Sequence, residues 1–174
     1  MAGKPRYKQP TEDRLIKSAL HYLERYATSA ANLRKVLERK VLKACMSLEL
    51  EPADYADLID AVVEKCVQTG LVNDKTYAET KTAGLRRRGG STRKIEAQLA
   101  AKGVDRETIH TVLAQDERSD EEAARIFARR RRLGPFRTTP NRDDRRDKDL
   151  AAMCRAGFSF EIARKVIDAD DSDH

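Results

Sequence analysis

Hydrophobic residues recur at helical spacing along most of the chain, and no segment shows the sustained alternation of apolar and polar residues that is typical of a strand. The pattern is clearest in residues 70–113, where it predicts three short helices separated by two turns. Gly89-Gly90 marks the first turn, because glycine adopts a left-handed backbone at little cost, and Ser91 is suited to cap the following helix. Gly103-Val104-Asp105 repeats this arrangement. A unit of this size is too small to be stable alone, so we expect neighbours of the same kind.

The first and last thirds of the chain repeat parts of this segment. In the first third, as in the central segment, a serine is followed by apolar side chains four and eight residues later. In the last third, a turn glycine is followed by an apolar side chain ten residues later, again as in the central segment. The matching sets are Ser91, Ile95 and Leu99 with Ser29, Leu33 and Leu37, and Gly103 and Leu113 with Gly157 and Ile167. Self-similarity of this kind indicates stacked helical repeats. The alternative is that an all-helical chain shows such matches by chance.

Apolar faces predict the helices of the first third. Thr11 is suited to cap the first helix. The residues expected to face inward on that helix are Leu15, Ala19, Leu20, Leu23 and Tyr26. A second helix starts near residue 30 and is expected to continue through Val41 and Ala44, because no glycine turn follows Leu37. A third helix is expected from about residue 53 to residue 69.

Polar residues mark the remaining helix ends. Asn73 and Asp74 are suited to begin a helix that runs to about Arg88, and Ser119 begins an S-x-x-E capping box. Residues 137–147 contain no apolar side chain and mix arginine with aspartate, so we expect a loop or mobile linker there.

The composition favours a helical protein with an acidic partner. Charged residues make up 37% of the 174 residues, and the net charge is +6. The chain is rich in good helix formers and has no tryptophan. A basic balance of this size suggests nucleic acid or an acidic protein surface as the partner, although a solvated helical surface also carries many charges.

The sequence provides no constellation for catalysis, a metal or a cofactor. Cys45, Cys66 and Cys154 lie far apart, and no CxxC or Cys/His cluster supports zinc or a disulfide framework. They are most simply small buried side chains in a reducing cytosol. The histidines are scattered along the chain and are expected to be exposed; they are His21, His110 and His174. No phosphate-loop, dinucleotide-binding or nucleophile-elbow motif is present.

The amino-terminal residues do not have the pattern of a signal peptide, and no apolar run approaches membrane-spanning length. We therefore expect a soluble, cytoplasmic protein with no membrane partner. A monomer is the expected state, because stacked repeats cover one another.

Positive charge gathers at three places. The first set lies opposite the apolar face of the second helix, the second flanks the Gly89-Gly90 turn, and the third ends the helix that begins after Ser119. In that order the sets are Arg34, Lys35, Arg39 and Lys40; Arg86, Arg87, Arg88, Arg93 and Lys94; and Arg129, Arg130, Arg131 and Arg132. The helix dipole accounts for one or two cations at a helix end, but not for five. Stacked repeats would join such sets into a surface for DNA phosphates or for acidic groups on a protein filament.

Three segments of the chain carry a family resemblance, and in order they are GLVNDKTYAE, RRRGGSTRKIEAQLAAKGVD and DLAAMCRAGFSFEIARKVI. Taken together, they resemble the RecX family of bacterial regulators of the RecA recombinase, and the likeness extends over about residues 15–168. The most specific part is a glycine-Leu-x-x-Asp-x-x-aromatic-Ala pattern. The residues that carry the resemblance are Gly70, Leu71, Asp74, Tyr77, Ala78, Gly103 and Gly157.

The resemblance implies an all-α fold of three tandem three-helix repeats in an elongated, curved molecule. The expected organisation is a disordered basic arm (residues 1–10), repeats at 11–69, 70–116 and 117–170, a mobile loop at 137–147 within the third repeat, and an acidic tail (171–174). The resemblance further implies binding to the RecA–single-stranded DNA filament, inhibition of its recombinase, ATPase and coprotease activities, and no enzymatic activity or cofactor.

An alternative from a different class is a free-standing DNA-binding protein that reads duplex DNA through a helix-turn-helix. Arg93 and Lys94 begin a helix after a short turn, which permits this interpretation. Against it, no set of Asn, Gln and Ser side chains is spaced along one outward helix face for base contacts.

Overall fold

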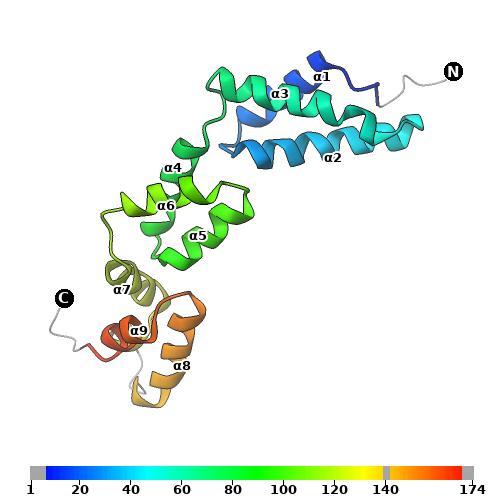
Figure 1. Ribbon diagram of the computed structural model, residues 1–174. Helices are drawn as coiled ribbons and strands as arrows, with labels where there is room; N and C mark the ends of the chain where they lie inside the picture. Colours follow the sequence, from blue (N-terminus) through cyan, green and yellow to red (C-terminus); the bar gives the residue numbers. More distant parts are fainter. Residues whose placement is uncertain (1–6, 139–141, 170–174) are drawn as a thin grey trace. The chain divides into compact units, whose positions relative to one another are not determined.

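The computed structural model describes residues 7–138 and 142–169, and within these ranges every regular element is helical (Figure 1). The α-helices are α1 (Glu12–Leu23), α2 (Ala30–Leu48), α3 (Ala56–Gln68), α4 (Asp74–Arg86), α5 (Thr92–Ala101), α6 (Arg106–Ala114), α7 (Asp120–Arg131), α8 (Arg142–Arg155) and α9 (Phe160–Ile167). Two 3₁₀ turns, η1 (Pro52–Tyr55) and η2 (Gly134–Phe136), precede α3 and α8. The all-α prediction is confirmed, and the helices form three consecutive groups of three.

Side-chain caps explain where most of these helices begin. The Ser29, Asp105 and Ser159 side chains each accept a hydrogen bond from a backbone N–H in the first turn of their helices. Ser119 and Glu122 form the complete capping box that the sequence predicted. Thr11 is different, because its side chain makes no capping hydrogen bond.

The structure divides into two compact units. The first contains the described residues up to Tyr77 together with Lys102–Val104. Its core is formed by α1, α2 and α3, and the largest fully buried side chains in it are Leu33, Leu37, Val41 and Val62. The extension of α2 is confirmed and reaches Leu48, because Val41 and Cys45 are buried in the same core.

Some inward positions predicted in this unit are wrong. Leu20 is 38% exposed and Tyr26 is 56% exposed, since α1 ends at Leu23 and its buried positions are Leu15 and Ala19. Residues 1–6 of the predicted arm lie outside the described residues. Residues 7–10 are placed, with Pro10 buried and the Gln9 amide donating a hydrogen bond to the Tyr55 hydroxyl.

The second compact unit contains residues 78–101 and the described residues from Asp105 onward. Within it, α7, α8 and α9 enclose a core that includes Met153, Phe158 and Ile167. The predicted loop at 137–147 is wrong in its second half, because α8 begins at Arg142. The Asp149 carboxylate of α8 accepts hydrogen bonds from Arg137 and from the Gly134 N–H, which ties the preceding turn to the helix.

One pair of contacts occurs in both units and supports the repeat interpretation. In the first unit, the Ser29 hydroxyl donates to the Lys102 carbonyl, and Asp74 accepts from the Ala30 N–H at 2.8 Å. In the second unit, the Ser91 hydroxyl donates to the Ala156 carbonyl at 2.7 Å, and Asp120 accepts from the Thr92 N–H at 2.8 Å. In each case a serine caps the second helix of a repeat and also binds the residue before a turn glycine. An aspartate at the start of another repeat's first helix binds the first N–H of that same second helix.

The residues of the family pattern have different local roles. Gly70, Gly103 and Gly157 adopt positive φ at the ends of α3, α5 and α8, as the turn prediction required. Ala78 is fully buried and Tyr77 is half-buried. Leu71 is 51% exposed, so the buried side chain at this turn is that of the next residue, Val72. The predicted acidic tail (171–174) lies outside the described residues.

Candidate functional site

The last turn of α4 holds a buried arginine with acidic partners. The Arg86 side chain is 4% exposed, and its Nε lies 2.5 Å from Asp116 Oδ2. Its Nη1 lies 2.6 Å from Asp120 Oδ1, and its remaining donors reach the Gly90 carbonyl and the Thr92 hydroxyl. We call these residues the Arg86 network. Arg86 was predicted to belong to a basic surface, and this is wrong because its charge is buried and neutralised inside the protein.

The network also perturbs its carboxylates. Burial by itself raises the pKa of the Asp120 carboxyl, but hydrogen bonds from Arg86 and Thr92 outweigh burial and hold that pKa below its ordinary value. Asp149 behaves in the same way. Burial raises the pKa of its carboxyl, but hydrogen bonds from Arg137 and from the Gly134 N–H outweigh burial, and the pKa is lowered. Both acids therefore stay ionised as internal partners of arginines.

A second group of cations lies near the Gly89-Gly90 turn, and it lines a surface groove instead of a buried site. Two adjoining pockets of about 480 and 440 Å³ share Lys94, Phe127 and Arg131 in their linings. We call the two pockets together the basic groove. Its cations are Lys81, Arg88, Lys94, Arg130, Arg131 and Arg155.

Close backbone contact brings the two halves of the groove together. A Cβ atom on Gly89 would lie 2.5 Å from the Phe127 nitrogen and 2.8 Å from the Ala123 carbonyl oxygen, so only glycine allows α4 to end against α7. Arg130 donates a hydrogen bond to the Arg88 carbonyl at 2.8 Å across this contact. The second and third basic sets of the sequence are thus joined in space.

The basic groove has no internal counter-charge. No acidic side chain lines either pocket, and none in the described parts of the chain lies within salt-bridge distance of the six cations. Arg131 lies over the Phe127 ring, with its guanidinium carbon 5.8 Å from the ring centre. The arrangement provides converging positive charge beside an aromatic side chain, which suits phosphate groups or acidic side chains from outside the protein.

The other predicted cations lie elsewhere. Arg87 and Arg93 are exposed, Arg129 lies over the Phe136 ring, and Arg132 is the left-handed cap of α7. In the first unit, Arg34 is paired with Glu38 and with Asp60, whereas Lys35 and Arg39 are exposed. Lys40 donates a hydrogen bond to the Ser18 hydroxyl at 3.0 Å.

The sequence interpretation missed three groove residues. Lys81 lies seven residues before Arg88, which is a helical spacing within the segment that the sequence predicted as one helix, so this signal was available even though α4 ends at Arg86. Arg155 and Phe127 had no such signal, because only the packing of α7 and α8 brings them to the groove.

The described residues contain no group of three or more His, Cys, Asp or Glu side chains arranged to hold a metal ion. His21 and His110 are exposed as predicted, and His174 lies outside the described ranges. Burial raises the pKa of the Cys45 and Cys66 thiols, but Cys154 is exposed, so the prediction that all three cysteines are buried is wrong for it. Within these ranges no helix has the length and apolar character needed to cross a membrane.

Comparison with known proteins agrees with this geometry. A family model described as "RecX, second three-helix domain" matches residues 73–113, the segment containing α4, α5 and α6. The chain is 46% identical over 170 residues to the regulatory protein RecX of Myxococcus xanthus, covering 96% of this chain and 90% of that protein. It is 35% identical over 150 residues to the regulatory protein RecX of Agrobacterium fabrum, covering 86% of this chain and 79% of that protein.

A solved structure supports the fold. A crystal structure of regulatory protein RecX superimposes with a TM-score of 0.65 at 18% identity, covering 91% of this chain and 72% of that one. The sequence match extends over nearly the whole chain, and the structure has the helical repeats expected of that fold. The chain therefore belongs to the RecX family of regulatory proteins.

Proposed function

We propose that this protein is a cytoplasmic regulator that binds the RecA–single-stranded DNA filament and lowers its recombinase, ATPase and coprotease activities. The observation that carries the proposal is the basic groove, because six cations, five of them exposed and Lys81 half-buried, converge there without an internal acidic partner. Phosphate groups of a single strand provide the missing counter-charge at regular spacing, and Phe127 adds an aromatic side chain to the lining of the groove. Contacts to the phosphate backbone carry no sequence information, which suits a filament of any DNA sequence.

The regulator is proposed to act by occupying phosphates and adjoining protein in the filament. A protein held there would obstruct the approach of a second DNA molecule and the rearrangements that accompany nucleotide hydrolysis. RecA is named as the partner because the relatives are regulatory proteins called RecX.

Filament binding tests this function directly. Fluorescence anisotropy would compare binding to RecA assembled with ATP on a labelled oligonucleotide and binding to the bare oligonucleotide, over a salt series. We expect tighter binding to the filament, together with slower ATP hydrolysis. Equal binding to the two would contradict the proposal and favour the alternative of a free-standing DNA-binding protein.

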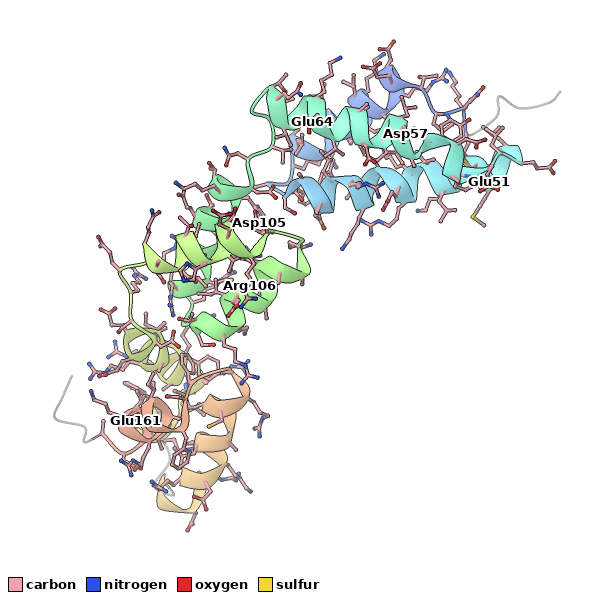
Figure 2. The ribbon with its side chains drawn as sticks, viewed as in Figure 1. Glu51, Asp57, Glu64, Asp105, Arg106 and Glu161 are labelled. Atoms are coloured by element: carbon pink, nitrogen blue, oxygen red, sulfur yellow. The ribbon has the colours of Figure 1, made fainter. Side chains whose placement is uncertain are left out.

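A charge variant tests the groove. Lys94→Gln with Arg131→Gln removes two cations that line both pockets. We expect filament binding to weaken about tenfold, or ~1.4 kcal/mol. The plot of log K against log salt should become shallower by about 1.4 for two lost contacts with a single strand. The matched control is Arg106→Gln with Arg164→Gln, which removes the same charge from exposed positions on α6 and α9 (Arg106 is labelled in Figure 2). A control that weakens binding equally would show that net charge, not the groove, is responsible.

A further inference from the structure

The side of α2 that faces away from its core carries an unusual mixture of side chains. Lys35, Arg39 and Lys43 follow one another at intervals of four residues, and Leu42 and Met46 lie beside them. Because an α-helix turns through about 100° per residue, these five side chains occupy an arc of roughly 100°. We call this arc the outer face of α2. All five side chains are exposed, with Leu42 46% exposed and Met46 75% exposed.

Folding does not account for the outer face. The opposite side of α2 contributes Leu33, Leu37, Val41 and Cys45 to the core, so the helix is already held by that side. Like charges four residues apart on a helix repel and reduce its stability. In the described parts of the chain no carboxylate lies within salt-bridge distance of Lys35, Arg39 or Lys43. Arg34, one residue away, shows the contrast, because Glu38 and Asp60 neutralise it.

Acidic side chains are present in the same unit, but they do not cover this face. Figure 2 labels Glu51, which caps η1, and Asp57 and Glu64 of α3, and all three are exposed. Asp60 of α3 is the carboxylate that reaches α2, and it binds Arg34. The outer face thus keeps both its positive charge and its exposed apolar side chains.

We propose that the outer face of α2 docks onto the protein component of the filament, on a surface that is acidic around an apolar spot. This rests on the function proposed above and assigns the protein contact to α2 and the phosphate contact to the basic groove. Leu42 and Met46 are aliphatic, so they gain nothing from phosphates and do not stack on bases as aromatic side chains do. Methionine and arginine are enriched at protein interfaces, where a flexible thioether adapts to an uneven apolar surface.

An anionic membrane is the other surface that attracts cations beside apolar side chains. Helices that lie in a membrane interface bury a large apolar face with aromatic or leucine side chains. The exposed large apolar side chains of α2 are only Leu42 and Met46, because Leu33, Leu37, Val41 and Cys45 are buried in the core and Val36 and Leu48 are half-buried. The outer face is therefore better suited to a protein surface than to lipid.

Paired variants separate this contact from the groove. Leu42→Gln with Met46→Gln changes only exposed side chains, so the fold should persist. We expect its affinity for the RecA filament to fall roughly tenfold while its affinity for the bare strand is unchanged. The matched control is Val67→Gln with Leu71→Gln, two exposed apolar residues of the same unit that lie outside α2, and it should bind the filament as the wild type does.

A photo-reactive amino acid at position 46 gives an independent readout. We expect ultraviolet irradiation of the complex to join position 46 to RecA and not to the oligonucleotide. An adduct with DNA, or a Leu42/Met46 variant that binds the filament within about twofold of wild type, would overturn the docking proposal while leaving the function intact. If the wild type itself binds the filament no better than the bare strand, the proposed function fails and this proposal fails with it.

Discussion

The Arg86 network and the basic groove lie on either side of the same turn, yet their cations are held in opposite ways. Arg86 is enclosed by Asp116, Asp120, the Gly90 carbonyl and the Thr92 hydroxyl, and it is almost completely buried. Arg88, two residues later, is exposed and lies in a groove with no acidic lining. Two arginines of one turn therefore have different roles: Arg86 stabilises the fold, whereas the charge of Arg88 is available to a partner.

The difference teaches how to separate structural from functional charge. A buried cation with complete hydrogen bonding has already exchanged its water for protein partners, so it has nothing left to offer a ligand. An exposed cation beside others of the same sign pays a repulsion that only an external anion relieves. Burial and the presence of a carboxylate decide between the two, not the density of arginine in the sequence.

Replacing Arg86 and Arg88 separately should give the largest difference in the free energy of unfolding. Arg86→Met leaves Asp116 and Asp120 without their cation in a buried site, and we expect a loss of about 3–5 kcal/mol in the free energy of unfolding. Arg88→Met changes an exposed side chain and should alter that free energy by less than about 0.5 kcal/mol. Urea unfolding followed by circular dichroism measures both. If both variants lost the same unfolding free energy, the distinction between a buried structural Arg86 and an exposed Arg88 would be wrong.

Gly89→Ala tests the contact that joins the two regions. The new Cβ would meet the backbone of α7 at 2.5 Å, and the residue has φ +78°, so we expect a loss of about 3 kcal/mol. Gly84→Ala is the matched control, because that glycine lies inside α4 and its Cβ would approach only the Arg87 side chain, at 3.7 Å. The control should be neutral or stabilise the protein by up to about 1 kcal/mol. Thermal unfolding of the two variants decides the point.

Ser91→Ala sharpens the comparison, because Ser91 lies between Gly90 and Thr92 of the Arg86 network and accepts a hydrogen bond from the backbone N–H of Lys94, a residue of the basic groove. The substitution removes the cap of α5 and leaves the Ala156 carbonyl without its donor. We expect a loss of about 2 kcal/mol in the free energy of unfolding. Ser91→Thr keeps a hydroxyl, so this variant is expected to retain part of the stability that Ser91→Ala loses. A neutral Ser91→Ala variant in chemical unfolding would contradict the capping role.

Acid should weaken both the Arg86 network and the pair of Asp149 with Arg137, and this is the smallest effect that we expect. The folded-state pKa values of Asp120 and Asp149 are lowered, so their contribution to stability is fully present above the ordinary carboxyl value of about 3.9. That contribution is lost as pH falls through the lowered values, because protonation then breaks the pairing with arginine. Urea unfolding between pH 7 and pH 3 should show a shallower acid loss for Asp120→Asn than for wild type. Parallel curves would argue against the pairing.

Much of the fold was available from the sequence, because turn glycines, capping residues and apolar spacing are local signals. The turns at Gly103 and Gly157 and the capping box at Ser119 were all predicted and are confirmed. The helical start of α8 was missed, because residues 142–147 have no apolar side chain to mark an inward face. Asp149 of that helix is buried, and its pairing with Arg137 depends on an interaction that composition does not reveal.

The candidate site was predictable only in part. A signal for the burial of Arg86 existed, since it lies four residues after buried Thr82 and eight after buried Ala78, on one stripe of α4. That stripe is difficult to recognise because Thr82 is polar. Nothing local indicated that Asp116 and Asp120 would meet Arg86.

The sequence by itself determined that this is a helical, basic, repetitive protein of the RecX family, because spacing, charge and short motifs are encoded along the chain. Only the tertiary structure decided which cations are neutralised and which remain available to a partner. The physical reason is that the fate of a charge depends on desolvation and on the groups that fold against it. For Arg86 those groups are Asp116 and Asp120, which lie 30 and 34 positions away in the sequence.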